Sequence, residues 1–167
     1  METLFENSHV RNNALAKEIY GYLYFRRKLI VVCHILIALS LLLNVISAVL
    51  GDSYSLFVFV FAPVLVLFRI YCYFSQVNTM VKRDRELHGE EITVQTQVTN
   101  DYIQSTAPNG AVNRLEFDKI RSAVQTKNLI LLRTKANLIY IFRKDAFTVG
   151  TKNEFIAFLQ TKGIRVS

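Results

Sequence analysis

The chain has 167 residues, a length typical of one small domain, alone or joined to a membrane segment. Hydrophobic residues make up 51% of it and gather in two long runs, a distribution that a small soluble domain does not have. The formal net charge of +7 makes the two usual anionic partners of basic proteins, the membrane surface and nucleic acid, the first to consider.

The N-terminal segment carries apolar residues at a spacing close to that of a helix. Val10, Leu15, Ile19 and Leu23 recur along it. We therefore predict that residues 1–28 form a cytoplasmic amphipathic helix that leads toward the membrane and packs on the membrane or on the later domain.

Two apolar runs follow directly. Residues 29–50 and 54–68 contain no charged side chain, and the second run reaches the length of a span only by continuing past Arg69 to Phe74. A helix needs about 20 apolar residues to cross the hydrocarbon core of a bilayer. The runs therefore predict a transmembrane helical hairpin over residues 29–74.

Two other interpretations of the runs fail. A buried helical hairpin would need a domain large enough to cover two helices that are apolar all round. A cleaved signal peptide would have an apolar region of roughly 7–15 residues followed by a small-residue cleavage site. The first run is longer than that, and a second run comes at once.

Basic side chains stand next to both runs, whereas the turn between them, residues 51–53, carries only an acid. Lys and Arg in short flanking segments favour the cytoplasmic side of a membrane. We therefore predict a protein with two spans and with both termini in the cytoplasm. The predicted membrane-interface residues are Arg26, Arg27, Lys28, Arg69, Lys82, Arg83 and Arg85.

Polar residues inside the runs need an explanation. Arg69 would lie about 7.5 Å below the membrane surface, a depth from which its guanidinium can snorkel to the headgroups. The alternative is that it holds a lipid phosphate or a partner within the membrane.

Asn44 is placed to bond across the hairpin or to another copy of the chain. Cys33 and Cys72 would lie at similar depths near the cytoplasmic face, as apolar packing residues.

Helical spacing continues after the second run. Val77, Met80 and Val81 keep it, and Gly89 stands where a helix commonly ends. Residues 75–89 are therefore expected to extend the second span as one cytoplasmic helix that stops near His88.

The pattern then changes to that of β-strands. "EITVQTQVT" alternates, with Ile92, Val94 and Val98 on one face. Asn109-Gly110 is a strong hairpin signal, and a second hairpin is expected where "NLILLRT" and "LIYIFRK" are separated by the turn at residues 135–137. These features predict several antiparallel strands.

A final helix is expected at the C-terminus. Thr151 and Glu154 have the spacing of a capping box, and Gly163 is placed to end the helix with Ile164 making the accompanying apolar contact. One apolar face would consist of Phe155, Phe158 and Leu159. We therefore predict an α+β membrane protein in which residues 90–167 form a small antiparallel sheet, bent or closed into a partial barrel, capped by this helix.

The segment from Glu116 to Ile164 resembles the C-terminal domain of the YcxB-like bacterial membrane proteins. The resemblance lies in Phe117 and Ile120 around a short connection, in the strands "QTKNLILL" and "IYIFRKDAF", and in the closing "EFIAFL". It implies a bacterial cell-membrane protein with a cytoplasmic domain like the pleckstrin-homology (PH) domain. It supplies no catalytic residues to transfer to this chain.

The sequence contains no recognisable catalytic or metal-binding motif. His9, His34 and His88 lie far apart, and none has a Cys or His at ligand spacing. Nothing distinguishes Asp118, Asp145 or Glu116 from solvated turn and strand residues. We therefore expect no cofactor, no metal and no enzymatic activity.

Two functional hypotheses follow. The first is a membrane-anchored binding module whose sheet edge or barrel mouth takes a peptide, a lipid headgroup or a partner protein. The second is envelope defence or bacteriocin self-immunity, exerted through the hairpin. Residues 75–167 carry 14 Lys and Arg against 9 Asp and Glu, which suits the anionic cytoplasmic leaflet. Expected partners are this leaflet, a peptide or membrane protein, and a second copy of the chain. Nucleic acid is not expected.

Overall fold

The chain folds into two compact units. One, the sheet unit, combines Met1–Asn12 with Asp84–Ser167, and the other, the helical unit, is Asn13–Arg83. The helical unit is thus an insertion between two segments of the sheet unit. The computed structural model describes residues 2–26, 28–51, 55–88, 92–107 and 110–167.

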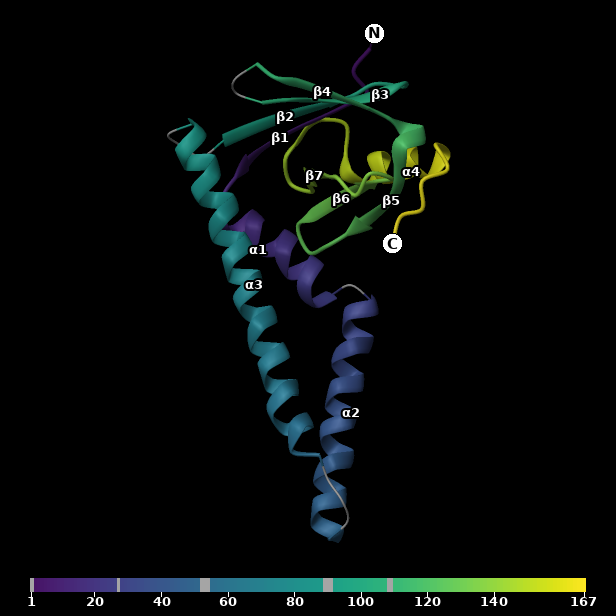
Figure 1. The fold of residues 1–167 in the computed structure, drawn as a ribbon. Coiled ribbons are helices and arrows are strands. Elements are labelled where there is room, and N and C mark those ends of the chain that lie inside the picture. The colour runs from purple at the N-terminus through teal and green to yellow at the C-terminus, as the bar shows by residue number, and fades with distance from the viewer. Residues whose placement is uncertain (1, 27, 52–54, 89–91, 108–109) are drawn as a thin grey trace. The chain divides into compact units, whose positions relative to one another are not determined.

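The helical unit contains two long apolar helices preceded by two short helical segments (Figure 1). Ile30–Leu50 and Phe57–Glu86 are long and apolar enough to cross a bilayer, and most of their large apolar side chains are exposed. The prediction of two such helices is confirmed. The bounds are α1 (Asn13–Gly21), the π-helix η1 (Tyr22–Arg26), α2 (Lys28–Leu50) and α3 (Leu56–His88).

The second long helix continues beyond the apolar run, as predicted, and reaches His88 without a break at Pro63. Gly89, the predicted stop, and residues 52 and 53 of the predicted turn lie outside the described residues. Asn44 bonds across the connection, one of its two predicted options. Its Oδ1 accepts from the Ser55 amide at 2.9 Å, and its Nδ2 donates to the Ser40 carbonyl at 3.0 Å.

The sheet unit contains two antiparallel sheets and one helix (Figure 1). Among the described residues the larger sheet has the order β4-β3-β2-β1-β8 and the smaller the order β5-β6-β7. Both sheets are open, so the predicted option of a sheet closed into a partial barrel is wrong. The helix is α4 (Lys152–Thr161). The strands are β1 (Phe5–Arg11), β2 (Ile92–Val98), β3 (Tyr102–Thr106), β4 (Val112–Glu116), β5 (Ile120–Gln125), β6 (Leu129–Thr134), β7 (Ile139–Arg143) and β8 (Phe147–Val149).

The N-terminal prediction is wrong for its first part. The segment Phe5–Arg11 is strand β1, and helical structure begins only at Asn13. β1 pairs along its whole length with β2, from Phe5 opposite Val98 to Arg11 opposite Ile92, and β8 pairs with its other edge. The strand escaped detection because its inward positions after Phe5 are polar, which removes the alternating hydrophobic pattern of a half-buried strand.

Both predicted hairpins are present. β3 and β4 are joined by a turn in which the Ala107 amide donates to the Ala111 carbonyl at 3.0 Å. Gly110 has φ 78°, a left-handed conformation that suits glycine, whereas Asn109 lies outside the described residues. The turn between β6 and β7 places Asn137 at φ 62°, which Asn tolerates better than most residues.

The closing helix forms with both predicted ends. Thr151 and Glu154 make the capping box, each side chain bonding the other's backbone amide. At the other end the Ile164 amide donates to the Leu159 carbonyl at 3.0 Å and the Gly163 amide to the Gln160 carbonyl at 2.9 Å, the paired bonds of a Schellman motif. These caps satisfy backbone groups that the helix itself leaves unpaired.

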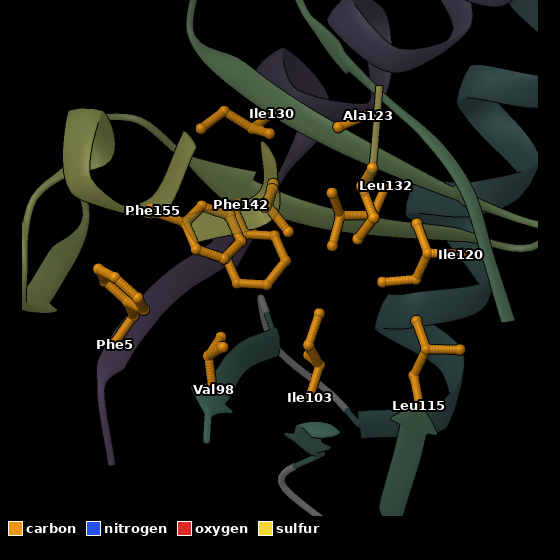
Figure 2. Packing of buried hydrophobic residues seen from close by; sticks show 12 residues of the cluster. Phe5, Val98, Ile103, Leu115, Ile120, Ala123, Ile130, Leu132, Phe142 and Phe155 are labelled. Atoms are coloured by element: carbon orange, nitrogen blue, oxygen red, sulfur yellow. The ribbon is translucent and has the colours of Figure 1, made fainter. Parts of the chain in front are cut away.

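The core lies between the two sheets and α4 (Figure 2). A row of apolar side chains crosses the larger sheet, formed by Phe5, Val98, Ile103 and Leu115 on four neighbouring strands. It faces side chains of the smaller sheet such as Phe142, whose ring centroid lies 4.6 Å from that of Phe155 on α4. The closing helix therefore packs on β7 through Phe155, a residue of its predicted apolar face.

Candidate functional site

A groove of about 310 Å³ lies between the two sheets of the sheet unit. One wall comes from β1 to β4, and the other comes from β7 and the residue before it. The groove is lined by His9, Arg11, Val94, Thr96, Ser105, Asn113, Leu138, Ile139, Tyr140 and Ile141.

The polar wall of the groove is a row of side chains across the larger sheet, next to the apolar row of the core. Strand register places Asn7 opposite Thr96, Thr96 opposite Ser105, and Ser105 opposite Asn113. Each residue of this row lies two positions along its strand from a residue of the apolar row. Side chains two residues apart on a strand share a face, so the two rows lie side by side on one face of the larger sheet. The inner face of one sheet therefore changes from a packing surface to a hydrogen-bonding surface.

Asn7 connects this row to the smaller sheet. Its side chain is fully buried, its Nδ2 donates to the Arg143 carbonyl at 2.8 Å, and its Oδ1 accepts from the Arg143 amide at 3.2 Å. A side-chain amide here takes the place of a neighbouring strand at the last residue of β7. The two sheets are thus joined by a pair of directional bonds as well as by apolar packing.

His9 is held as a neutral imidazole beside the groove. Burial, the main cause, acts together with the positive charges of Arg143 and Arg11 to lower its pKa from 6.5 to about 4. Its Nδ1 lies 3.3 Å from Oδ1 of Asn7, an acceptor, so the proton is assigned to Nδ1. Nε2 is then a hydrogen-bond acceptor.

Arg11 stands at the end of the groove and pairs with a buried acid. Its Nε lies 3.2 Å from Oδ2 of Asp84, although the angle is too poor for a hydrogen bond. Since the acid offsets its charge, the groove is polar without being strongly cationic. This electrostatic character suits a neutral hydrogen-bonding ligand better than a multiply charged anion.

The free edge of β7 forms the opposite wall. Three consecutive residues, Ile139 to Ile141, line the groove, so the strand presents its edge there as well as one face. The Arg143 backbone groups point to Asn7, away from β6. Backbone direction alternates along a strand, so the N–H and C=O groups of Ile139 and Ile141 point away from β6 as well. In the described part of the chain β7 pairs with β6 alone.

The predicted membrane-interface residues lie at separate places along the helices. Arg26 is exposed at the end of η1, Lys28 is the first residue of α2, and Arg27 lies outside the described residues. Exposed side chains near the end of α3 are Lys82, Arg83 and Arg85.

Arg69 has a protein partner. Its side chain is half-buried, and Nε donates to the Tyr24 carbonyl at 2.9 Å. The guanidinium carbon lies 6.0 Å from the centre of the Tyr24 ring. Cys33 on α2 and Cys72 on α3 are free thiols.

Two of the acids considered from the sequence, Asp145 and Glu116, are paired with basic side chains at the surface. Arg143 donates to both carboxylate oxygens of Asp145, which lowers the pKa of that acid. Glu116 accepts from Lys119 at 2.8 Å and raises the pKa of the lysine. In the described ranges no three His, Cys, Asp or Glu side chains gather into a potential metal site.

Sequence reasoning missed the groove residues Arg11 and Thr96 and the buried Asn7 beside the groove, and it noted His9 only as an isolated histidine. Their common signal was the two-residue spacing of Phe5, Asn7, His9 and Arg11. The segment could not be recognised as a strand without knowing that it pairs with β2. The polar residues form a row only through the register between neighbouring strands.

Part of the sheet unit matches a known protein family. Residues 98–159 match the family described as YcxB-like protein, a range that runs from the end of β2 into α4. No curated protein and no solved structure matches the chain. The resemblance found in the sequence is therefore confirmed, and residues 98–159 of this chain form a YcxB-like region.

Proposed function

We propose that the chain is a non-enzymatic, membrane-anchored binding module whose sheet unit is a PH-like domain in the bacterial cytoplasm. Two antiparallel sheets that share a hydrophobic core with a C-terminal helix support the PH-like description. The two long apolar helices support the anchor.

Strand pairing supports the placement of both termini on one side of the membrane. β1 precedes the two apolar helices and β2 follows them, yet the two strands pair over seven residues. A chain that crosses a bilayer twice returns to the side where it started, and only then can β1 and β2 meet. The basic residues that flank the helices support the cytoplasm as that side.

The ligand we propose is an extended peptide segment that adds to the free edge of β7. The observation that carries this proposal is the orientation of Ile139 and Ile141, whose unpaired backbone groups face the groove. Main-chain bonds to such an edge supply affinity, and side-chain contacts beside it supply specificity. Thr96, Ser105 and Asn113 are placed to contact polar side chains of the peptide.

Ile141→Pro tests this proposal because it removes one edge N–H, and an edge strand tolerates proline on that side. The probe is a peptide selected from a random library against the full chain in nanodiscs. We expect Ile141→Pro to weaken its affinity about tenfold, as the loss of one backbone hydrogen bond allows. Ile141→Val, which keeps the N–H, should bind like the wild type.

Circular dichroism of both variants checks that the sheets remain folded. Equal affinity of the two variants, or failure to select any peptide, would contradict binding at this edge. The alternative proposal, envelope defence through the helical hairpin, gives a different result. A bacteriocin-protection assay should be unaffected by Ile141→Pro in that case, because the helices are unchanged.

A further inference from the structure

The helical unit contains a second concave site, separate from the inter-sheet groove. α2 and α3 diverge from the end where the chain turns (Figure 1), and a cavity of about 630 Å³ lies between them. Its walls are mainly apolar, with Leu36, Ile37, Leu65 and Phe68 among the lining side chains.

This cavity continues along the helices toward the turn. A neighbouring cavity of about 250 Å³ shares Leu36, Ile37 and Leu65 with it and extends to Phe61. At the rise of an α-helix, Arg69 and Phe61 are separated by about 12 Å along the axis. The two cavities share part of their walls, and the apolar surface that they form together, with a polar end at Arg69, is here called the interhelical channel.

The polar end has a defined hydrogen-bonding character. The bond from Nε of Arg69 to the Tyr24 carbonyl orients the guanidinium and leaves its two terminal nitrogens as donors. His34 also lines this end, and its Nδ1 lies 2.8 Å from the Ile30 carbonyl. A carbonyl only accepts, so in the neutral imidazole Nδ1 carries the proton and Nε2 is an acceptor. No lining residue of the channel is an acid.

We infer that the interhelical channel binds one anionic glycerophospholipid. The phosphate would lie on the terminal nitrogens of Arg69, a headgroup hydroxyl would donate to Nε2 of His34, and one acyl chain would occupy the channel toward Phe61. This inference rests on the proposed membrane anchoring. A single uncompensated cation at the end of an apolar channel favours a lipid with net negative charge over a zwitterionic one.

The test uses the full chain in nanodiscs that contain phosphatidylcholine with a small fraction of phosphatidylglycerol. Retained lipid is measured by native mass spectrometry after transfer to detergent. We expect wild type to retain one phosphatidylglycerol and Arg69→Gln to retain about tenfold less, because a charge-assisted hydrogen-bond pair is lost. Arg121→Gln makes the same charge change at an exposed position of β5, outside the channel and the predicted membrane interface, and should retain lipid like the wild type.

A second variant tests the acyl chain separately. Leu65→Trp fills the part shared by the two cavities while keeping Arg69, and it should also lose the bound lipid. Inorganic phosphate added in excess should not displace the lipid from the wild type. Retention by both variants equal to wild type would overturn the inference, as would displacement by phosphate or a second copy of the chain cross-linked in the channel.

Carbonate extraction separates this inference from the anchor on which it rests. Release of the chain from membranes by carbonate would refute the anchor itself. A chain that resists extraction, but whose Arg69→Gln and Leu65→Trp variants keep the lipid, would refute only the lipid site.

Discussion

Asn7 shows how much one buried polar side chain can decide. It satisfies both backbone groups of Arg143, which would otherwise lie unpaired near the core. A buried backbone group without a partner costs about 1–3 kcal/mol, so the amide is strongly held. Because it bonds the backbone of Arg143, the last residue of β7, it leaves Ile139 and Ile141 as the residues whose backbone groups form the free edge. The same side chain therefore stabilises the sheet pair and defines one end of the groove.

A pH dependence follows at the residue scale from His9. Its pKa is 6.5 in the unfolded chain and about 4 in the folded one, so the unfolded chain binds the proton more readily. The stability that this residue contributes is fully present above pH 6.5 and is lost as the pH falls toward 4. The loss should reach about 3 kcal/mol at pH 4.

His9→Asn provides the control, because its side-chain amide can still donate to Asn7 but does not titrate. Urea unfolding followed by circular dichroism at pH 7 and pH 4 measures the difference. The wild type should lose about 3 kcal/mol more than the variant over this interval. An equal loss in both would show that His9 is protonated in the folded chain without penalty.

At the scale of elements, α4 is stabilised mainly by one aromatic cluster. The Phe155 ring contacts those of Phe5, Phe142 and Phe147, with centroid distances from 4.6 to 5.5 Å. Phe158 is only half-buried and contacts the rings of Phe5 and Phe117 at 5.5 Å. The predicted apolar face is confirmed, and Phe155 is its most buried aromatic residue.

Substitutions in α4 should follow that ranking. Phe155→Ala removes a fully buried ring and should cost about 3–5 kcal/mol of unfolding free energy. Phe158→Ala should cost less, because part of its surface already meets solvent. Thr151→Ala removes a cap and no core contact, and should cost about 1 kcal/mol. Urea unfolding curves of the three variants measure this order, and Phe158→Ala above Phe155→Ala would refute the packing described.

At the scale of the whole molecule, the central feature is the place of β1. It lies inside the larger sheet between β2 and β8, and it supplies Phe5, Asn7 and His9 to the core and the groove. The helical unit is inserted between β1 and β2. The sheet unit therefore cannot be complete until both apolar helices have been synthesised, which links its folding to the formation of the hairpin.

Removal of β1 should be severe. Residues 84–167 expressed alone should aggregate or unfold, because β2 and β8 lose their shared neighbour and the core loses Phe5. Joining residues 1–12 to residues 84–167 through a short Gly-Ser linker should restore a soluble, folded protein. The linker can be short because Arg11 and Ile92 lie opposite each other.

Circular dichroism and NMR dispersion of the two proteins measure this difference. The shorter protein serves as the control for the fused one, since they share every residue of the C-terminal segment. A well-folded 84–167 fragment would mean that β1 is dispensable.

The sequence by itself determined the elements whose signals are local. Uncharged runs identify α2 and α3 because the cost of burying charge in lipid acts residue by residue. The capping box at Thr151, the stop at Gly163 and the hairpin turns follow from bonds between near neighbours in the chain. The YcxB-like resemblance belongs here too, since it was recognised from local patterns of apolar residues between Glu116 and Ile164, and the family match covers residues 98–159.

Only the tertiary structure decided the rest. β1 is a strand because β2 and β8 offer it partners, whereas its own side chains carry no hydrophobic alternation. The groove exists because register aligns polar residues from four strands opposite the free edge of β7. Such arrangements depend on contacts between residues distant in sequence, and no local pattern records them.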